Sequence, residues 1–358
     1  MTALRRAAAY PPLRRTLKAL IGRLPVGRAR FMRFARSVAD GVDRGSRRRG
    51  PAVATPAENL PKHLVSATAK PVAGDGPDPP LVEDAVAITD RRYGPSGKAA
   101  PVFDVALFEE LNEEYASKPI VPQPRGNDPA SAAARARKRL DMVHEEVDLT
   151  GRRALEFGCG AGFEVWMLSH RFDADATGID IVARKSWPSL TDEHTRFVMA
   201  DLAVDQPFPP DSFDRIVSFS VFEHVTHPHG TLRELYRVLR PGGLAVIGAN
   251  LHRGPMASHR YREVFFPWPH LLFTDDVFRE FYARKGLPPA GPSWVNRLTW
   301  AEYEGLFRRV GFRLRSLRFT ERPLDEAFYE RFEGVLGRYP RWDLTKDFFH
   351  VVAEKPAQ

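Results

Sequence analysis

The residues with the clearest chemical potential lie at positions 154–162, which read Ala-Leu-Glu-Phe-Gly-Cys-Gly-Ala-Gly. An apolar run that carries Glu156 ends in three glycines at alternate positions, Gly158, Gly160 and Gly162, and a helix-like run follows. Glycine tolerates positive φ and has no Cβ, so this turn can bring bare backbone against a bound small molecule. A strand, a glycine turn and a helix N-terminus together predict a nucleotide pocket.

Two further carboxylates stand where strand-like runs end. Asp180 closes the run 176–180, about twenty residues after the glycines, where an acid can accept hydrogen bonds from both ribose hydroxyls. Asp201 lies at the end of a third run, 196–202. Because the glycines follow a G-x-G-x-G pattern instead of the G-x-G-x-x-G dinucleotide fingerprint, the ligand is not expected to carry a pyrophosphate.

The elements that must position these residues alternate between strand and helix. Residues 212–219 read as a fourth strand, and a helix with apolar positions within 232–239 stops at Arg-Pro-Gly-Gly before a fifth strand begins at Leu244. The periodicity then predicts helices at 274–285, 299–310 and 324–336, a sixth strand at 312–319 and a seventh at 347–354. This alternation predicts an α/β fold with a doubly wound sheet and helices on both of its faces.

Residues from about 150 to 250 resemble a class I S-adenosylmethionine-dependent methyltransferase, of the family with an E-x-G-C-G-x-G first motif. The resemblance implies a Rossmann-like seven-stranded sheet with an antiparallel last strand, and S-adenosyl-L-methionine as the cofactor. It also implies a cofactor-binding set. In that set Glu156, Gly158, Gly160 and Gly162 line the methionine end, Asp180 binds the ribose, Asp201 and the Leu202 backbone meet the adenine, and Ile181 and Ser218 complete the group.

Each of these signals also has a simpler explanation. A glycine cluster can be no more than a turn, and an acid at a strand end is often a helix cap. The strand-by-strand order favours the cofactor site, because independent caps are not expected to repeat it. Cys159 is the only cysteine, so a disulfide within the chain is excluded, and we expect it to act as a small apolar residue.

His224, directly after the fourth strand, is the candidate catalytic residue. If the fold is right, it projects at the methyl-facing end of the cleft, where it can take a proton from the acceptor or orient it. A histidine that bonds the loop backbone is the simpler alternative. Glu223 and His224 resemble part of the Glu-x-x-Glu-His group of ubiquinone O-methyltransferases, but Ser220 replaces the first glutamate, so we expect no metal.

The charge of the chain is concentrated at its start. Residues 1–50 contain 14 Lys and Arg against 2 Asp, whereas the rest of the chain has 39 basic and 43 acidic residues. The body is therefore mildly acidic, and no nucleic-acid partner is expected. The basic arm has apolar residues at helical spacing, which favours docking on an anionic membrane surface, and a solvated tail or a helix packed on a partner fits it equally well.

The domain organisation follows from these shifts in composition. We expect a basic amphipathic arm at 1–50, a Pro, Gly and Ala-rich linker at 51–100, a helical lead-in that covers the cofactor cleft at 101–150, and the methyltransferase domain at 151–358. An aromatic stretch at 261–273 lies in a lid insertion at about 252–298. Since no run of eighteen apolar residues is present, a cytoplasmic protein that can dock on a membrane is expected.

The functional prediction separates the donor from the acceptor. The motifs indicate methyl transfer from S-adenosylmethionine. The aromatic lid and the interrupted last strands resemble those of bacterial glycan-modifying methyltransferases, which favours O-methylation of a sugar hydroxyl on a glycan, glycolipid or related metabolite. Methylation of a quinone, lipid or small aromatic metabolite is the alternative, and a non-catalytic cofactor-binding module is the alternative outside the enzymes. The sequence does not indicate an oligomeric state.

Overall fold

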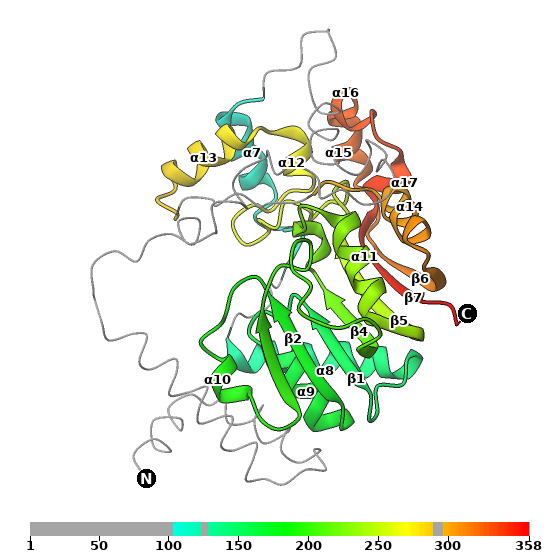
Figure 1. The fold of residues 1–358 in the computed structure, drawn as a ribbon. Coiled ribbons are helices and arrows are strands. Elements are labelled where there is room, and N and C mark those ends of the chain that lie inside the picture. Colours follow the sequence, from blue (N-terminus) through cyan, green and yellow to red (C-terminus); the bar gives the residue numbers. More distant parts are fainter. Residues whose placement is uncertain (1–102, 123–127, 289–295, 358) are drawn as a thin grey trace, which may run out of the picture.

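The computed structural model describes residues 103–122, 128–288 and 296–357, so the predicted arm at 1–50 and linker at 51–100 lie outside the described residues. Its centre is one seven-stranded sheet with the order β3-β2-β1-β4-β5-β7-β6 (Figure 1). The strands are β1 Arg153–Phe157, β2 Asp175–Asp180, β3 Thr195–Met199, β4 Phe213–Phe219, β5 Leu239–Asn250, β6 Arg313–Glu321 and β7 Lys346–Glu354.

The direction of the strands confirms the predicted fold class. Strands β1 to β5 pair in parallel, whereas β7 runs antiparallel between β5 and β6. Parallel neighbours bring all their carboxyl ends to one edge of the sheet, and the strand order reverses beside β1. In open α/β sheets that edge and that reversal point form the ligand crevice, and the glycine turn follows β1 there.

Helices cover both faces of the sheet because its strands are apolar on both sides. Leu155 packs with α11 (Pro228–Val238) and α14 (Trp300–Val310), whereas its neighbour Ala154 packs with α8 (Pro129–Glu146) and α9 (Phe163–Phe172). Ile216 and Val217 of β4 divide between the two faces in the same way. Successive side chains of a strand point to opposite faces of the sheet, so each pair of neighbouring residues contributes one side chain to each core.

A third apolar core forms a helical cap next to the carboxyl end of β5, at the top of Figure 1. We call this group the cap. Phe108 is fully buried at its centre, with four aromatic ring centroids 4.7–5.1 Å away. The cap contains α7 Val105–Glu114, α12 Pro269–Leu272, α13 Asp275–Arg284, α15 Glu326–Arg331, α16 Glu333–Leu336 and α17 Arg341–Leu344. The lead-in, the lid insertion and the excursion between β6 and β7 therefore share one core.

Element boundaries follow local chemistry closely. Helix α14 is capped at its start by Thr299, whose side chain forms a capping box with Glu302, and at its end by Gly311, which has φ of 105°. The third strand was expected to continue to residue 202 but ends at Met199, because Asp201 accepts a hydrogen bond from the Ala203 N–H and closes a turn. The two helices of the lead-in lie apart, α7 in the cap and α8 against the sheet.

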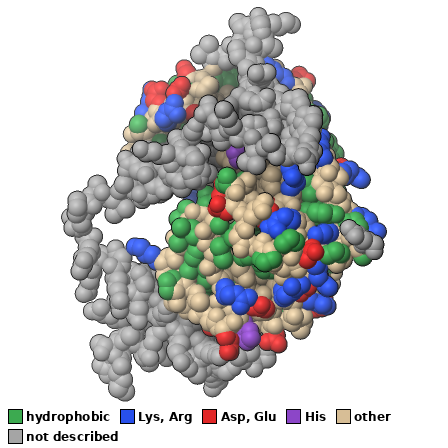
Figure 2. Space-filling model, viewed as in Figure 1, with side chains coloured by type: hydrophobic (Ala, Val, Ile, Leu, Met, Phe, Trp, Pro, Cys, Tyr) green, Lys and Arg blue, Asp and Glu red, His purple; other side chains and the backbone are tan. Residues whose placement is uncertain are grey.

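Among the described residues, no helix is both long and apolar enough to cross a membrane. On the face in Figure 2, acidic and basic side chains are interspersed over the lower body of the molecule.

Candidate active site

The glycine turn has the backbone that its sequence predicted. Gly158, Gly160 and Gly162 have φ of 75°, 48° and 82°, a region that favours glycine. A Cβ on Gly158 would lie 2.3 Å from Val221, and one on Gly162 would lie 2.5 Å from the Phe197 ring. Gly158 and Gly162 are thus required by packing.

Gly160 differs from the other two glycines, because a Cβ there would meet nothing within 4 Å. Its backbone is open to a ligand, while its N–H donates to the Asp180 carboxylate at 2.9 Å. The other Asp180 oxygen accepts from the Val182 N–H at 3.0 Å. Each carboxylate oxygen keeps a free lone pair for a further donor, so the arrangement fits a ribose held at this edge.

Glu156 lies beneath the turn and is almost fully buried. Its Oε2 has no hydrogen-bond partner among the described residues, which makes it a ready acceptor for a cationic ligand group. Burial raises the pKa of Glu156 well above its ordinary value, nearby Glu164 adds to the rise, and Arg139 opposes it. Arg139 forms an ion pair with Glu164 at 3.0 Å between α8 and α9.

The remaining predicted cofactor residues lie around the same edge. Ile181 follows β2 and is 45% exposed, an unusual state for a large apolar side chain next to a polar turn. Ser218 on β4 is fully buried, and its Oγ has no partner within the described residues. Asp201 closes a turn with the Ala203 N–H while Leu202 is buried, so a structural role of Asp201 is visible and an adenine contact stays a prediction.

Sequence reasoning missed two residues that brace the turn. The Trp187 indole N–H, in α10 (Trp187–Leu190), donates to the Gly160 carbonyl at 2.8 Å, and the Ser186 hydroxyl donates to the Ala161 carbonyl at 2.8 Å. The Trp187 ring also stacks on Phe197 with centroids 5.1 Å apart. Neither residue stands at a recognisable spacing from the glycines, so no pattern in the sequence marked them.

The predicted catalytic residue lies in the short 3-10 helix η2 (Phe222–His224) just after β4. His224 is exposed, whereas Glu223 beside it is fully buried. Ser220 turns the chain from β4 into η2 with φ of 59°, a conformation that costs free energy in a residue other than glycine. The structure thus holds a strained turn at the carboxyl end of β4, next to the glycine turn.

A buried network fixes the backbone of η2. The Asn296 N–H donates to the Glu223 carbonyl at 2.6 Å, and its side-chain amide donates to the Phe222 carbonyl at 2.6 Å. The Tyr303 hydroxyl, from α14, donates to the Asn296 side-chain oxygen at 3.1 Å. Because every link is buried, the backbone of η2 is held firmly at the point where the His224 side chain leaves it.

His259, from the lid insertion, completes this side of the site. Its ring makes an edge-to-face contact with His224, with centroids 5.1 Å apart. Burial, with a smaller contribution from the neighbouring His224, lowers the pKa of His259 to about 4. Burial also raises the pKa of Glu223 to about 8, although the backbone N–H groups of Glu223 and Asn250, which lie outside hydrogen-bonding geometry, partly oppose the rise.

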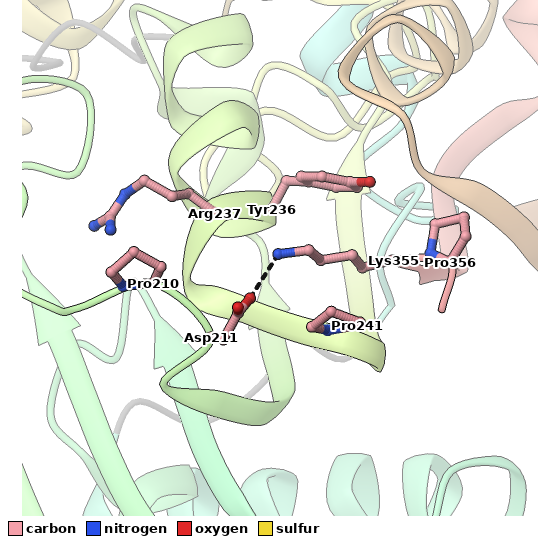
Figure 3. A pocket seen from close by; sticks show the side chains of 7 residues that line it. All are labelled: Pro210, Asp211, Tyr236, Arg237, Pro241, Lys355 and Pro356. Carbon is pink, nitrogen blue, oxygen red and sulfur yellow. Dashed lines mark hydrogen bonds and ion pairs between the residues drawn. The ribbon is translucent and has the colours of Figure 1, made fainter. Parts of the chain in front are cut away.

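A separate pocket lies at the opposite edge of the sheet, as Figure 3 shows. It is lined by Tyr236 and three prolines, and its lysine, Lys355, is engaged by Asp211 at 2.7 Å and by the Leu239 carbonyl at 2.7 Å. This edge holds the amino ends of the parallel strands, away from the glycine turn. It therefore lies outside the candidate active site.

Comparison with known proteins agrees with this geometry. Residues 155–247 match a family model described as a methyltransferase domain. The chain is 29% identical over 126 residues to a ubiquinone biosynthesis O-methyltransferase of Pseudomonas entomophila, covering 33% of this chain and 53% of that protein. It is 31% identical over 143 residues to the methyltransferase GfsG of Streptomyces halstedii, covering 38% and 50%.

The similarity is confined to part of each protein. The chain spans about half the length of the curated relatives it matches. Among solved structures, an S-adenosylmethionine-dependent methyltransferase from Mesorhizobium loti is 19% identical, with a TM-score of 0.41, and covers 62% of this chain and 99% of that one. The fold is established by the sheet order and strand directions of the protein itself. With its glycine turn inside the matched segment 155–247, the chain carries a methyltransferase domain of the class I S-adenosylmethionine-dependent family.

Proposed function

We propose that the protein is an O-methyltransferase that uses S-adenosylmethionine to methylate a sugar hydroxyl of a glycan, glycolipid or related metabolite. The observation that carries the proposal is the polar acceptor side of the site. Next to the glycine turn stands the exposed His224, with His259 and the buried Glu223 beside it. A hydroxyl acceptor needs such groups, because its proton must leave as the oxygen is methylated.

The donor site fits the expected cofactor on three observations. Gly160 leaves its backbone open, Asp180 retains acceptor capacity, and Glu156 has a buried oxygen without a partner among the described residues. When bound, S-adenosylmethionine supplies a methyl carbon that bonds to the acceptor oxygen as its bond to sulfur breaks, leaving the electron pair on sulfur. The residues of the chain bind and align the two partners, which is the main requirement for an in-line displacement.

His224 is the residue that we assign to the acceptor proton. It is exposed at the end of η2, while its backbone is held by Asn296 through the neighbouring residues of η2. An imidazole nitrogen of His224 accepts the hydroxyl proton and passes it to solvent. The rigid backbone and the exposed ring suit this role, because the base must be fixed in place and must reach water.

The packing of the lid supports a polyhydroxylated acceptor over a flat apolar one. Phe266 and Trp268 are each 1% exposed, and the Trp268 indole N–H donates to the Leu344 carbonyl at 3.1 Å. These aromatic side chains stabilise the cap core, so they are not available to line an acceptor pocket. The aromatic side chains of the lid thus act through their packing in the cap.

A second candidate acceptor is the ring hydroxyl of a quinone precursor or small aromatic metabolite. The observation that favours it is the similarity to proteins named as ubiquinone biosynthesis O-methyltransferases, including one from Xanthomonas oryzae pv. oryzae that is 31% identical over 154 residues, covering 36% of this chain and 63% of that protein. Both candidates are hydroxyl acceptors, so the same base serves each. They differ in the surface that the acceptor needs.

Isotope transfer separates these candidates. The full chain is incubated with methyl-labelled S-adenosylmethionine and extracts of glycans, lipids and aromatic metabolites, and labelled products are identified by mass spectrometry. Label in a sugar O-methyl ether supports the proposal, and label only in aromatic ethers supports the second candidate. Donor binding by calorimetry without any labelled product would instead indicate a binding module. His224→Gln should lower turnover at least tenfold, whereas His227→Gln, in the same loop, serves as the matched control.

A further inference from the structure

The carboxylate of Glu223 is the most unusual group outside the donor site. The side chain is fully buried, and neither of its carboxylate oxygens has a hydrogen-bond partner among the described residues. A buried carboxylate without a partner is strongly unfavourable, and buried charges in proteins are normally paired or bound to a metal. Its place beside the predicted base suggests that a ligand of the site provides the missing partner.

Two histidines lie close enough to Glu223 to bind the same ligand. One possible ligand atom each from Glu223, His224 and His259 lie within 4.8 Å of one another. His259 reaches this position from the lid insertion with φ of 57°, and Ser220 turns into η2 with φ of 59°. Non-glycine residues in this region store strain and gather at functional sites, and here one belongs to the three-residue group and the other begins the turn into η2.

We propose that Glu223, His224 and His259 bind one divalent transition-metal cation, with Zn²⁺ as the reference ion. Two imidazoles and one carboxylate are the donors that such ions prefer, whereas Mg²⁺ prefers oxygen ligands and keeps much of its water. Three protein ligands leave at least one coordination position for an acceptor oxygen, as in catalytic zinc sites. With the ion bound, His224 would be a ligand and no longer the base, and the ion would take over that role by lowering the pKa of a bound hydroxyl. This acceptor role rests on the proposed function, while the binding of the cation does not.

The three side chains are arranged to close on an ion with little rearrangement. Ligand atoms on a tetrahedral ion about 2.1 Å away lie about 3.4 Å apart, so some must approach by about 1 Å or slightly more. The backbone of Glu223 is held by the network through Asn296 and its side chain is fully buried, and His259 is half-buried, whereas His224 is exposed. The buried Glu223 side chain thus has the least room to move, and the exposed His224 ring has the most.

The proposal replaces the expectation of no metal, which depended on Ser220 standing where a glutamate would complete a carboxylate pair. The fold brings a different third ligand to the group. His259 lies far along the chain, in the lid insertion, and joins the group only because that insertion folds back over η2. No local spacing links the two segments, so the sequence motif alone could not reveal this donor set.

Metal titration of the full, tag-free chain tests the proposal. The protein is stripped with a chelator, dialysed and titrated with Zn²⁺ by calorimetry, and with Co²⁺ while its visible absorption is recorded. We expect one equivalent of either ion to bind, with a Kd in the micromolar range or below, and equimolar Mg²⁺ should not compete. Glu223→Gln and His259→Asn should each weaken binding at least tenfold, since outright loss of a ligand removes a coordinate bond.

Matched variants keep the test decisive. His227→Gln removes a histidine from the same loop and should bind Zn²⁺ like the parent. If the buried variants fail to fold by circular dichroism, His224→Gln carries the test, because His224 is exposed. The absence of a one-equivalent site, or equal weakening by His227→Gln, overturns the proposal. Calorimetry with S-adenosylhomocysteine on the same samples reports the donor site separately, so a failure of the proposed function would be visible there.

Discussion

At the residue scale, the three glycines of the turn have different roles in packing and in donor binding. A Cβ on Gly162 would lie 2.5 Å from the Phe197 ring, whereas a Cβ on Gly160 would meet nothing within 4 Å. Gly162→Ala should therefore lower the free energy of unfolding by about 2–4 kcal/mol, through overpacking together with the cost of positive φ. Urea unfolding measures the change.

Gly160→Ala should give the opposite pattern. The new methyl group projects into open space, so the loss of stability should stay near the 1 kcal/mol or so that positive φ costs. The same methyl group stands where the donor must approach, so S-adenosylhomocysteine should bind at least tenfold more weakly by calorimetry. Equal stability losses in the two alanine variants, with donor affinity unchanged in Gly160→Ala, would refute this division of roles.

Asp180 provides a second test of the donor site. Asp180→Ala removes a carboxylate that accepts the N–H groups of Gly160 and Val182. Because hydrogen bonds to charged groups contribute about 1.5–3 kcal/mol, donor affinity should fall about 10–100-fold while circular dichroism stays native. Asp175→Ala, at the exposed amino end of the same strand and paired with Arg196, should bind the donor normally. Unchanged donor affinity in Asp180→Ala would remove Asp180 from the site.

The sequence could predict the local geometry of the turn, whereas the binding of the donor there stays a prediction. The glycines at 158, 160 and 162 and the acid at 180 have fixed spacings, because one turn must meet the end of the next strand. Trp187 and His259 obey no such spacing. Each reaches the site through tertiary packing, the first by stacking on Phe197 and the second through the lid insertion. A single sequence shows periodicity, but it does not show which distant segments meet.

At the scale of elements, prediction succeeded where caps and periodicity agree. Helix α14 was expected at 299–310, and the Thr299 capping box and Gly311 make its ends unambiguous. The helix expected at 324–336 instead breaks at Phe332, whose φ of −115° interrupts the helical backbone between α15 and α16. Phe332 is buried in the cap, so the requirements of packing override helix propensity there.

Helix α12 contains an acid-sensitive element of the cap. The His270 Nε2–H donates to the His252 carbonyl at 2.7 Å, so the ring is neutral with Nδ1 unprotonated, and that atom is buried without a partner among the described residues. Burial lowers the pKa of His270 from 6.5 to about 4. Protonation of Nδ1 would thus place a buried N–H without an acceptor in the core, which destabilises the folded state.

The sign of the pH effect follows from this lowered pKa. The contribution of neutral His270 to stability is complete above the unfolded pKa of 6.5 and is lost as the pH falls toward 4. In this range the unfolded chain binds a proton at His270 that the folded chain does not bind. The loss should amount to about 1–3 kcal/mol over that range. His270→Gln, which can keep the donor to His252, should flatten the decline in Tm between pH 7 and 5. Exposed His194→Gln is the control, and parallel declines for all three proteins would rule out His270 as the cause.

At the scale of the whole molecule, charge is divided between the start of the chain and its body. Residues 1–50 carry 14 basic and 2 acidic residues, whereas the rest has 39 basic and 43 acidic. We propose that residues 1–50 attract the protein to anionic membrane surfaces, since each basic residue near such a surface contributes about 1 kcal/mol. Removal of residues 1–50 should reduce cosedimentation with phosphatidylserine vesicles. Equal sedimentation of both forms would reject this role.

The cap joins three distant parts of the chain into one core beside the sheet. Phe108 lies at its centre with rings from 266, 273, 278 and 281 around it, so Phe108→Ala should cost about 3–5 kcal/mol of cap stability. Hydrogen exchange should then rise in α7, α12 and α13 while β1 and β4 stay protected, because their core is separate. Phe307→Ala, in the core under α14, should reverse the pattern. A uniform rise in both variants would mean that cap and sheet unfold as one unit, and the lid could then not open without loss of the donor site.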